Sequence, residues 1–441
     1  MMKYIRSELI SRIMPCLFLI LAIFTSFLAI AQETDSGAIL LHAARVFDGN
    51  NIRTNTSVLL INGQVAQIDM RESFKSSNAK VIDLGDATLL PGFIELHAHL
   101  SFQNVPADTV LKHGITTIRD VGGPLHKPYG GDGSLRVLTS GPIITAPNGY
   151  PIPMLGDTNI AVAVSTEKEA RTTVRDLING GAVVIKIALE PGGEAGAPWS
   201  SGHGHGSGRD HTSSHGHGHG HHAQSGAKHA HTHHKPAFNA SHSKPAWPLL
   251  PENIVKAIVG EAHKNNRKVT AHIAEAKGAE IAINTGVDEW AHMPCDVITE
   301  SLLKKAVAQT VKIVTTLDTL SRCSGVAHNA STWTALGGKL LYGAEIAHPD
   351  IPWGIDSQEL MYMMQMGRMG LIDVLRAATS KAGQQLNIPL LGTLQRDAPA
   401  DIIAVRGDPT HNLKTLEYPD LVISGGKIIV NNFENQWPVS P

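Results

Sequence analysis

Two histidines separated by a single residue, His97 and His99 in "LLPGFIELHAHL", are the first side chains that could do chemistry. Alternate residues of a β-strand point to the same side, so both rings can face the interior of a barrel and reach one metal ion. Neutral imidazole is a good ligand for zinc. On its own the pair is a weak signal, because two ordinary histidines can share this spacing.

Two further histidines strengthen the prediction. His272 in "VTAHIAEA" and His292 in "DEWAHMP" each end an expected buried strand. Strand ends converge at the face where barrel enzymes hold their active sites. The four histidines therefore predict a metal centre with zinc as the default ion, and other divalent metals remain open.

Lys186 in "VVIKIAL" is the next residue whose side chain could take part in a reaction. Ile185 and Ile187 are expected to face the outer helices, which turns Lys186 inward, where an ammonium group is costly unless it is paired or deprotonated. One interpretation is a structural lysine bound to a carboxylate. The other is a desolvated amine that takes up carbon dioxide, and the resulting carbamate would be an anionic bridge between two metal ions.

Near-continuous apolar runs carry these residues, and segments of helical character separate the runs. Examples are "GITTIRDVGG", "GAVVIKIAL", "RKVTAHIAE" and "VKIVTTLDT", which are typical of strands buried on both faces of a parallel sheet. About eight such runs occur in residues 89–345. The predicted fold class is therefore α/β, with a (β/α)₈ TIM-like barrel over residues 89–389.

Both ends of the chain alternate apolar and polar residues instead. The stretches "AILLHAARVFDGN", "SVLLINGQVAQID", "ADIIAVRGDP" and "DLVISGGKIIV" show this alternation, which is typical of short, half-buried strands. We expect residues 32–88 and 390–441 to form one small composite β-sandwich domain.

A histidine-rich insertion, residues 201–243, interrupts the barrel sequence. Thirteen of the chain's 24 histidines lie between His203 and His242, among many glycines and serines. Such a stretch buries too little apolar surface to fold alone, so a disordered loop at the catalytic face is expected. The irregular spacing predicts weak auxiliary metal binding that gathers ions beside the barrel, and an inert surface insertion is the alternative. The auxiliary ligands are His203, His205, His215, His217, His219, His221, His222, His231, His233 and His234.

The first residues predict export of the chain. Three basic residues precede an apolar run over residues 16–30, which closes on small residues. This is the pattern of a cleavable signal peptide, residues 1–31, with cleavage after Ala31, and a membrane anchor is the alternative. The mature chain is expected to be periplasmic or secreted, without a membrane span.

The amino-acid composition limits the kinds of binding partner that can be expected. A formal net charge of −2 gives no reason to expect nucleic acid, so metal ions and a small-molecule substrate are the expected partners, and a homo-oligomer remains open. Cys295 and Cys323 can pair in an oxidising compartment, although two cysteines alone also allow free thiols.

The chain resembles the amidohydrolase superfamily of metal-dependent hydrolases, and most closely its imidazolonepropionase-like and prolidase-like dipeptidase branch. The resemblance rests on "LPGFIELHAHL", "GITTIRDVGG", "LRAATSKAGQQL" and "GTLQRDAPADIIAVRGDP", in that order, and covers nearly all of the mature chain apart from the histidine-rich insertion. It implies that His97 and His99 bind the more buried metal ion. It also implies that a carbamate on Lys186 bridges two ions and that His272 and His292 bind the second ion.

One residue departs from the family pattern. The family normally ends strand eight with an aspartate that binds the metal and takes a proton from the attacking water, whereas "KLLYGAEIAHPD" places Glu345 there. Glutamate keeps the carboxylate but reaches further. Glu345 is therefore the predicted base and metal ligand, with Asp350 and Asp356 as alternative bases and a purely structural Glu345 as a further possibility.

Together these residues predict hydrolysis of an amide-type carbon–nitrogen bond. Two metal ions lower the pKa of water and polarise the carbonyl, while a carboxylate moves the proton to the leaving nitrogen. Dipeptides, N-acyl amino acids and cyclic amides fit this chemistry. An esterase or lactonase would use the same residues, and a periplasmic metal-buffering or metal-delivery protein on a degenerate hydrolase scaffold is the non-enzymatic alternative.

Overall fold

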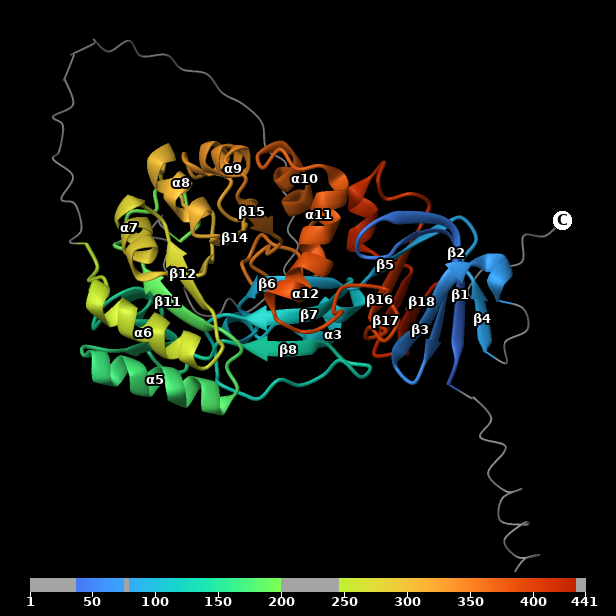
Figure 1. Cartoon of the computed structure of the whole chain (residues 1–441), viewed down its shortest axis with the longest axis horizontal. Helices are drawn as coiled ribbons and strands as arrows, with labels where there is room; N and C mark the ends of the chain where they lie inside the picture. The colour runs from blue at the N-terminus through green and yellow to red at the C-terminus, as the bar shows by residue number, and fades with distance from the viewer. Residues whose placement is uncertain (1–36, 75–78, 200–245, 434–441) are drawn as a thin grey trace, which may run out of the picture.

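The structure is a computed structural model and describes residues 37–74, 79–199 and 246–433. The predicted signal peptide and the histidine-rich insertion lie outside the described residues, including all ten auxiliary ligands. Figure 1 shows a barrel with outer helices at one end of the molecule and the strands of both chain termini together at the other. In the described parts of the chain, no helix has the length and apolar character needed to cross a membrane.

Strands from both chain ends form one sheet in the order β18-β17-β16-β5-β1-β2-β3, with β4 paired to β1. Strand β16 joins β5 through pairs such as Ile403 with Leu90, which ties the C-terminal segment to the N-terminal one. Residues of both segments, among them Leu41, Val58 and Ile423, share one buried cluster. The predicted small β domain is confirmed, and its strands are continuous in hydrogen bonding. They are β1 (Ile39–Phe47), β2 (Ile52–Ile61), β3 (Gln64–Met70), β4 (Lys80–Asp83), β5 (Ala87–Pro91), β16 (Ile402–Arg406), β17 (Leu421–Ser424) and β18 (Lys427–Asn431).

The barrel strands are short, parallel and buried, as the apolar runs predict. They pair in the orders β6-β7-β8 and β10-β9-β11-β12-β13-β14-β15. The strands are β6 (Phe93–Ala98), β7 (Ile115–Asp120), β8 (Arg136–Thr139), β9 (Ile143–Thr145), β10 (Ala161–Ala163), β11 (Ile185–Leu189), β12 (Val269–Ile273), β13 (Glu289–Trp290), β14 (Lys312–Val314) and β15 (Lys339–Leu341).

Two joins connect these two groups of strands. β8 pairs with β7, and β9 pairs with β11. β8 and β9 therefore together occupy one strand position of the barrel, which is interrupted at Gly141 and Pro142. Proline lacks the N–H that a continuous ladder needs there. At the other join Ala98 bridges Ile346 in parallel, and the His99 N–H donates to the Ile346 carbonyl at 2.9 Å. The α/β class with a barrel arrangement is therefore confirmed.

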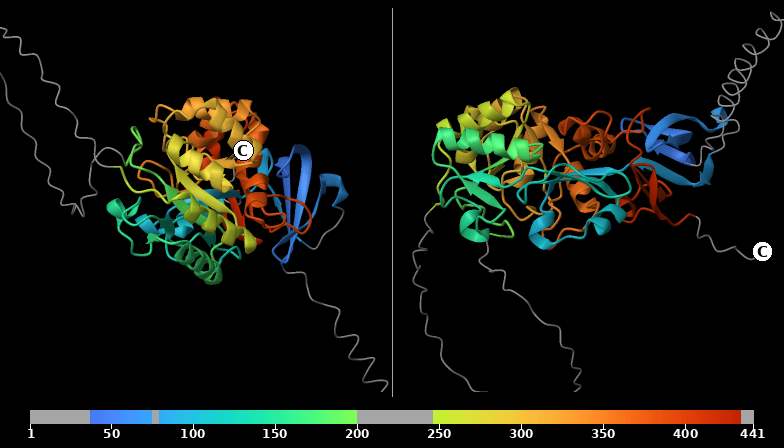
Figure 2. Two further views of the ribbon diagram at one scale, coloured as in Figure 1. Left: turned by 60° about the vertical axis from the view of Figure 1, so that its left-hand side comes forward. Right: turned by 90° about the horizontal axis from the view of Figure 1, so that it is seen from below.

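Amphipathic helices cover the outside of the barrel (Figures 1 and 2). Helix α5 begins with a reciprocal capping box between Thr166 and Glu169. Its buried residue Val174 belongs to the same hydrophobic cluster as Ile185 and Ile187 of β11. The helices are α2 (Leu100–Gln103), α3 (Ala107–Lys112), α4 (Ile152–Leu155), α5 (Glu167–Gly180), α6 (Glu252–Lys264), α7 (Ala276–Thr285), α8 (Glu300–Ala308), α9 (Val326–Ala335), α10 (Ser357–Gln365), α11 (Leu371–Ala378) and α12 (Ser380–Gln385), with 3₁₀ turns η1 (Arg71–Ser73) and η2 (Leu413–Glu417).

Two cross-links fix loops that follow barrel strands. The Trp247 N–H donates to the Pro191 carbonyl at 2.9 Å, so the chain leaves β11 and returns toward α6 at one point. Cys295 and Cys323 form a disulfide with Cα atoms 4.9 Å apart, which joins the loops after β13 and β14. The sequence alone leaves open whether these two cysteines pair.

Candidate metal centre

The first-strand histidines meet at the end of β6. His97 is fully buried, and its Nε2 lies 3.2 Å from His99 Nε2. The Nδ1 of His97 donates to the Ala291 carbonyl at 2.8 Å, which leaves the lone pair on Nε2. Two imidazole nitrogens at this separation present their lone pairs to a common point, as two ligands of one metal ion do.

The histidines of strands five and six lie beside this pair. The His97 and His292 ring centroids are 4.3 Å apart, and those of His272 and His292 are 4.5 Å apart. His292 Nδ1 is bonded to the Thr316 hydroxyl at 2.9 Å, so its Nε2 is left for a metal ion. The structure therefore brings together all four histidines that the sequence singled out.

Burial keeps three of these imidazoles neutral. It is the largest cause that lowers the pKa of His97 and His99 well below the usual range, and nearby Lys186 lowers it further. Burial and the neighbouring His272 lower the pKa of His292 in the same way. Neutral imidazole is the form that binds metal, so the surroundings suit coordination.

Glu345 supplies a carboxylate to the same group. Its Oε1 lies 3.8 Å from His99 Nε2 and its Oε2 lies 4.0 Å from His292 Nδ1. Ligand atoms of His97, His99 and Glu345 lie within 4.8 Å of one another. Burial raises the pKa of Glu345 to about 8, although Lys186 opposes the rise. Two imidazoles and a carboxylate form a donor set that zinc and similar divalent ions bind.

Glu345 reaches the histidines through an unusual backbone. Its φ is 69°, in the left-handed region that a non-glycine residue rarely adopts, and it follows β15 by four residues. Asp350 is exposed, and Asp356 is buried at the N-cap of α10, where it accepts the Gln358 N–H at 2.9 Å. Of the three candidate bases, the structure places Glu345 at the histidines.

Lys186 is buried in the barrel, with 1% of its surface exposed. Within the described chain its amine forms no ion pair or hydrogen bond, so a simple structural pairing does not account for it. Burial lowers the pKa of Lys186 to about 7, against the raising effect of the Glu345 carboxylate. The amine is therefore partly unprotonated near neutral pH, which is the state that reacts as a nucleophile.

Glu95 is a site residue that the sequence analysis missed. It is fully buried, and its two oxygens accept the His97 N–H at 2.7 Å and the Ala344 N–H at 2.9 Å. It thus fixes the backbone of a β6 ligand to that of the β15 end. Gly343 allows this approach, because a Cβ there would lie 2.3 Å from Val314 Cγ1 and 3.1 Å from His97 Cβ. Glu95 shares the alternation of His97 and His99, and this signal could have identified it.

A second group of ligand-type residues was also missed. Glu190 and Glu194 follow β11, and ligand atoms of these residues and His272 lie within 4.8 Å of one another. His272 Nε2 lies 2.7 Å from Glu194 Oε1, and the Trp199 indole N–H donates to the other Glu194 oxygen. Tyr150 packs against His272 with ring centroids 4.6 Å apart.

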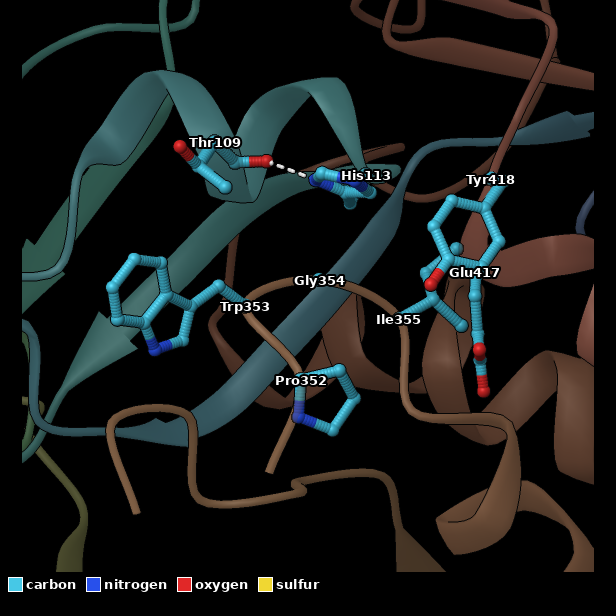
Figure 3. Close-up of a pocket in the computed structure, with 8 residues that line it drawn as sticks. All are labelled: Thr109, His113, Pro352, Trp353, Gly354, Ile355, Glu417 and Tyr418. Atoms are coloured by element: carbon cyan, nitrogen blue, oxygen red, sulfur yellow. Dashed lines mark hydrogen bonds between the residues drawn. The ribbon is translucent and has the colours of Figure 1, made fainter. Parts of the chain in front are cut away.

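A surface pocket of about 200 Å³ lies away from these residues. Figure 3 shows Trp353, Pro352 and Tyr418 around it, with the His113 Nδ1 bonded to the Thr109 carbonyl at 2.8 Å. None of the predicted metal ligands lines this pocket. The chemistry therefore belongs to the histidine group and not to this surface hollow.

The sequence pattern of the Amidohydrolase family matches residues 88–429. The chain therefore belongs to the amidohydrolase family.

Curated relatives match over part of the chain. Ochratoxinase of Aspergillus niger is 27% identical over 206 residues, which are 42% of this chain and 43% of the relative. Allantoinase of Arabidopsis thaliana is 30% identical over 130 residues, 25% of this chain and 26% of the relative. The chain thus spans less than half the length of these relatives.

Solved structures match over most of the chain and share its fold. The A. niger ochratoxinase structure has a TM-score of 0.66 and 18% identity, covering 90% of this chain and 96% of that one. A prolidase complexed with N-methylphosphonate-L-proline has a TM-score of 0.67 and 19% identity, covering 89% and 100%.

Proposed function

We propose that the chain is a metal-dependent hydrolase that cleaves an amide bond in a dipeptide, an N-acyl amino acid or a cyclic amide. The observation that carries the proposal is the convergence of His97, His99 and Glu345 beside the unpaired, buried Lys186. The names of the prolidase and ochratoxinase neighbours support a substrate with an amide bond.

The residues divide the work as follows. His97, His99 and Glu345 would hold one ion, and His272 and His292 would hold a second, with Lys186, as its carbamate, between them. Zinc ions bound there would lower the pKa of water and polarise the scissile carbonyl. Glu345, with its raised pKa, accepts the proton of water and returns it to the leaving nitrogen, since a carboxylate poised near neutral pH can act in both directions.

We also propose that the protein works outside the cytoplasm. The basic and apolar pattern of residues 1–31 supports export. The disulfide between Cys295 and Cys323 is a second, independent support, because such bonds persist in oxidising compartments.

The decisive experiment is a substrate screen. The zinc-loaded protein is incubated with a mixed set of dipeptides, N-acyl amino acids, cyclic amides, esters and lactones, and products are identified by mass spectrometry. We expect turnover of at least one amide, abolished in Lys186→Ala. Turnover restricted to esters or lactones would make the protein an esterase or lactonase. No turnover at all would favour the metal-buffering alternative, which the histidine-rich insertion also supports.

A further inference from the structure

Two buried carboxylates lie next to each other on the loop that follows β11. Glu190 is 1% exposed and Glu194 is 4% exposed. Within the described chain, neither forms an ion pair with a lysine or an arginine, and the one ionisable side chain paired with Glu194 is His272. Adjacent carboxylates in a low-dielectric site repel each other unless a proton or a metal cation is held between them.

Glu190 also has an oxygen without a partner. Its Oε1 accepts the N–H groups of Gly192 and Gly193, the latter at 2.8 Å, whereas its buried Oε2 has no hydrogen bond. An unsatisfied buried carboxylate oxygen is costly, so it indicates a missing ligand. Glu194 keeps capacity as well, because each of its oxygens has a second lone pair beyond those used for His272 and Trp199.

We propose that Glu190, Glu194 and His272 form an additional site for a divalent cation, distinct from the His97–His99–Glu345 group. Two carboxylates and one imidazole are a donor set for Zn²⁺, Co²⁺ or Mn²⁺, with water completing the coordination. His272 has two ring nitrogens, and Nε2 is the one that faces Glu194. Nδ1 is then left for the second ion that His272 would share with His292. The cation replaces the proton between Nε2 and Glu194, this proton passes to solvent, and the ring bridges the two ions as an imidazolate while the cation neutralises the carboxylate pair.

The position of this site links it to the insertion. Glu190 and Glu194 lie between the end of β11 and residue 199, the last described residue before the insertion. The chain returns at Trp247, whose N–H is bonded to the Pro191 carbonyl. A cation held here sits where the histidine-rich insertion leaves and rejoins the barrel.

The test counts bound Mn²⁺ on the full chain. Mn²⁺ is the weakest binder of the first-row series, so a Gly-His insertion takes up little of it. Metal-free wild type, Glu190→Gln, Glu194→Gln and the control Asp296→Asn are titrated with Mn²⁺, and free ion is measured by electron paramagnetic resonance. Glu190→Gln retains an oxygen for the Gly192 and Gly193 amides, so the loop keeps its bonds.

We expect Glu190→Gln and Glu194→Gln each to bind one Mn²⁺ fewer per chain than wild type and Asp296→Asn. Glu345→Gln, which alters the other group, should leave the Mn²⁺ held by Glu190, Glu194 and His272 in place. Equal stoichiometry in Glu190→Gln and wild type would overturn the proposal, as would a loss in Glu194→Gln alone, which would make Glu194 a positioning partner of His272.

A second measurement needs no variant. Anomalous diffraction from Co²⁺-soaked crystals of the wild-type protein should give a peak among the Glu190, Glu194 and His272 side chains. A peak confined to the His97–His99–Glu345 group would exclude the additional site while leaving the hydrolase proposal intact.

Discussion

At the scale of single residues, Lys186 and Glu345 combine burial with opposite charge. Each side chain lies in the barrel interior, and the Coulombic effect of each on the other favours its charged form. Burial works against both charges. The two groups are therefore held near the point where either protonation state is accessible at neutral pH, which suits a reactive amine and a proton-accepting carboxylate.

Replacement of the lysine tests the proposed bridge. Lys186→Ala should lose turnover and at least one tightly bound metal ion per chain, and short-chain carboxylic acids should partly restore both by occupying the vacated space. Metal content and activity are measured together. Lys268→Ala, at a half-buried residue just before β12, serves as a control that keeps both. Full metal content and normal turnover in Lys186→Ala would refute the bridging role.

Replacement of the strand-eight acid tests the base. Glu345→Gln keeps the shape but removes the proton acceptor, so we expect turnover to fall roughly 100-fold or more while the ions of the other ligands stay bound. Steady-state kinetics and metal analysis decide this. If Asp350→Asn shows the loss and Glu345→Gln does not, the assignment of the base is wrong.

At the scale of elements, the disulfide joins two loops at the ligand-bearing ends of neighbouring strands. Cys295 lies three residues after His292, and Cys323 follows β14. Cross-linking residues 28 apart stabilises a chain by about 3.6 kcal/mol, mainly by restricting the unfolded state. We expect Cys295→Ser to lower the free energy of unfolding by that order, measured by chemical denaturation. Two free thiols in unreduced, denatured wild type would contradict the bond.

The contribution of the α10 N-terminus to protein stability is expected to depend on pH. Burial, with a smaller effect of nearby Asp318, raises the pKa of Asp356 to about 7. A raised carboxyl pKa means that the folded state holds the proton more tightly than the unfolded state. This stabilisation is complete below about pH 4 and is lost as the pH rises through about 7.

Asp356→Asn should remove this dependence. Asparagine still caps the helix, so the hydrogen bond to the Gln358 N–H remains. Between pH 5 and pH 8 the free energy of unfolding of the variant should rise by on the order of 2 kcal/mol relative to that of wild type. Urea denaturation at both pH values measures these free energies. Parallel pH profiles would show that Asp356 has an ordinary pKa in the folded protein.

The elements also explain which parts of the site could be predicted from sequence. The two-residue period of a strand placed His97 and His99 on one side and turned Lys186 inward, and both follow from local geometry. The group formed by Glu190 and Glu194 could not be predicted, because loop contacts with Trp199 and Trp247 set its path.

Backbone details were equally hidden. The left-handed φ of Glu345 has no counterpart in the local sequence pattern. The barrel and the composite β domain could be predicted because their strands carry long, regular apolar patterns. Charged residues in irregular segments carry no such pattern.

At the scale of the whole molecule, the insertion and the barrel are expected to divide metal gathering from catalysis. Deletion of residues 202–242 with a short linker should leave turnover unchanged in zinc-replete buffer, remove several weakly bound ions, and slow reactivation of the metal-free protein under limiting zinc. The gathering should weaken as the pH falls through about 6.5, because imidazole binds metal only when neutral. Loss of turnover at saturating zinc would mean that the insertion shapes the active site.

The bond between Trp247 and Pro191 also bears on how the chain tolerates changes of length. The Trp247–Pro191 bond ties together the two ends of this segment, and the sequence predicts a disordered loop over residues 201–243. Adding or removing residues there is therefore expected to change mainly the entropy of closing a loop. That cost grows by only about 0.6 kcal/mol for each doubling of a flexible loop. Duplication or loss of short Gly-His units can therefore change the number of histidines widely while the folding equilibrium of the barrel stays nearly constant.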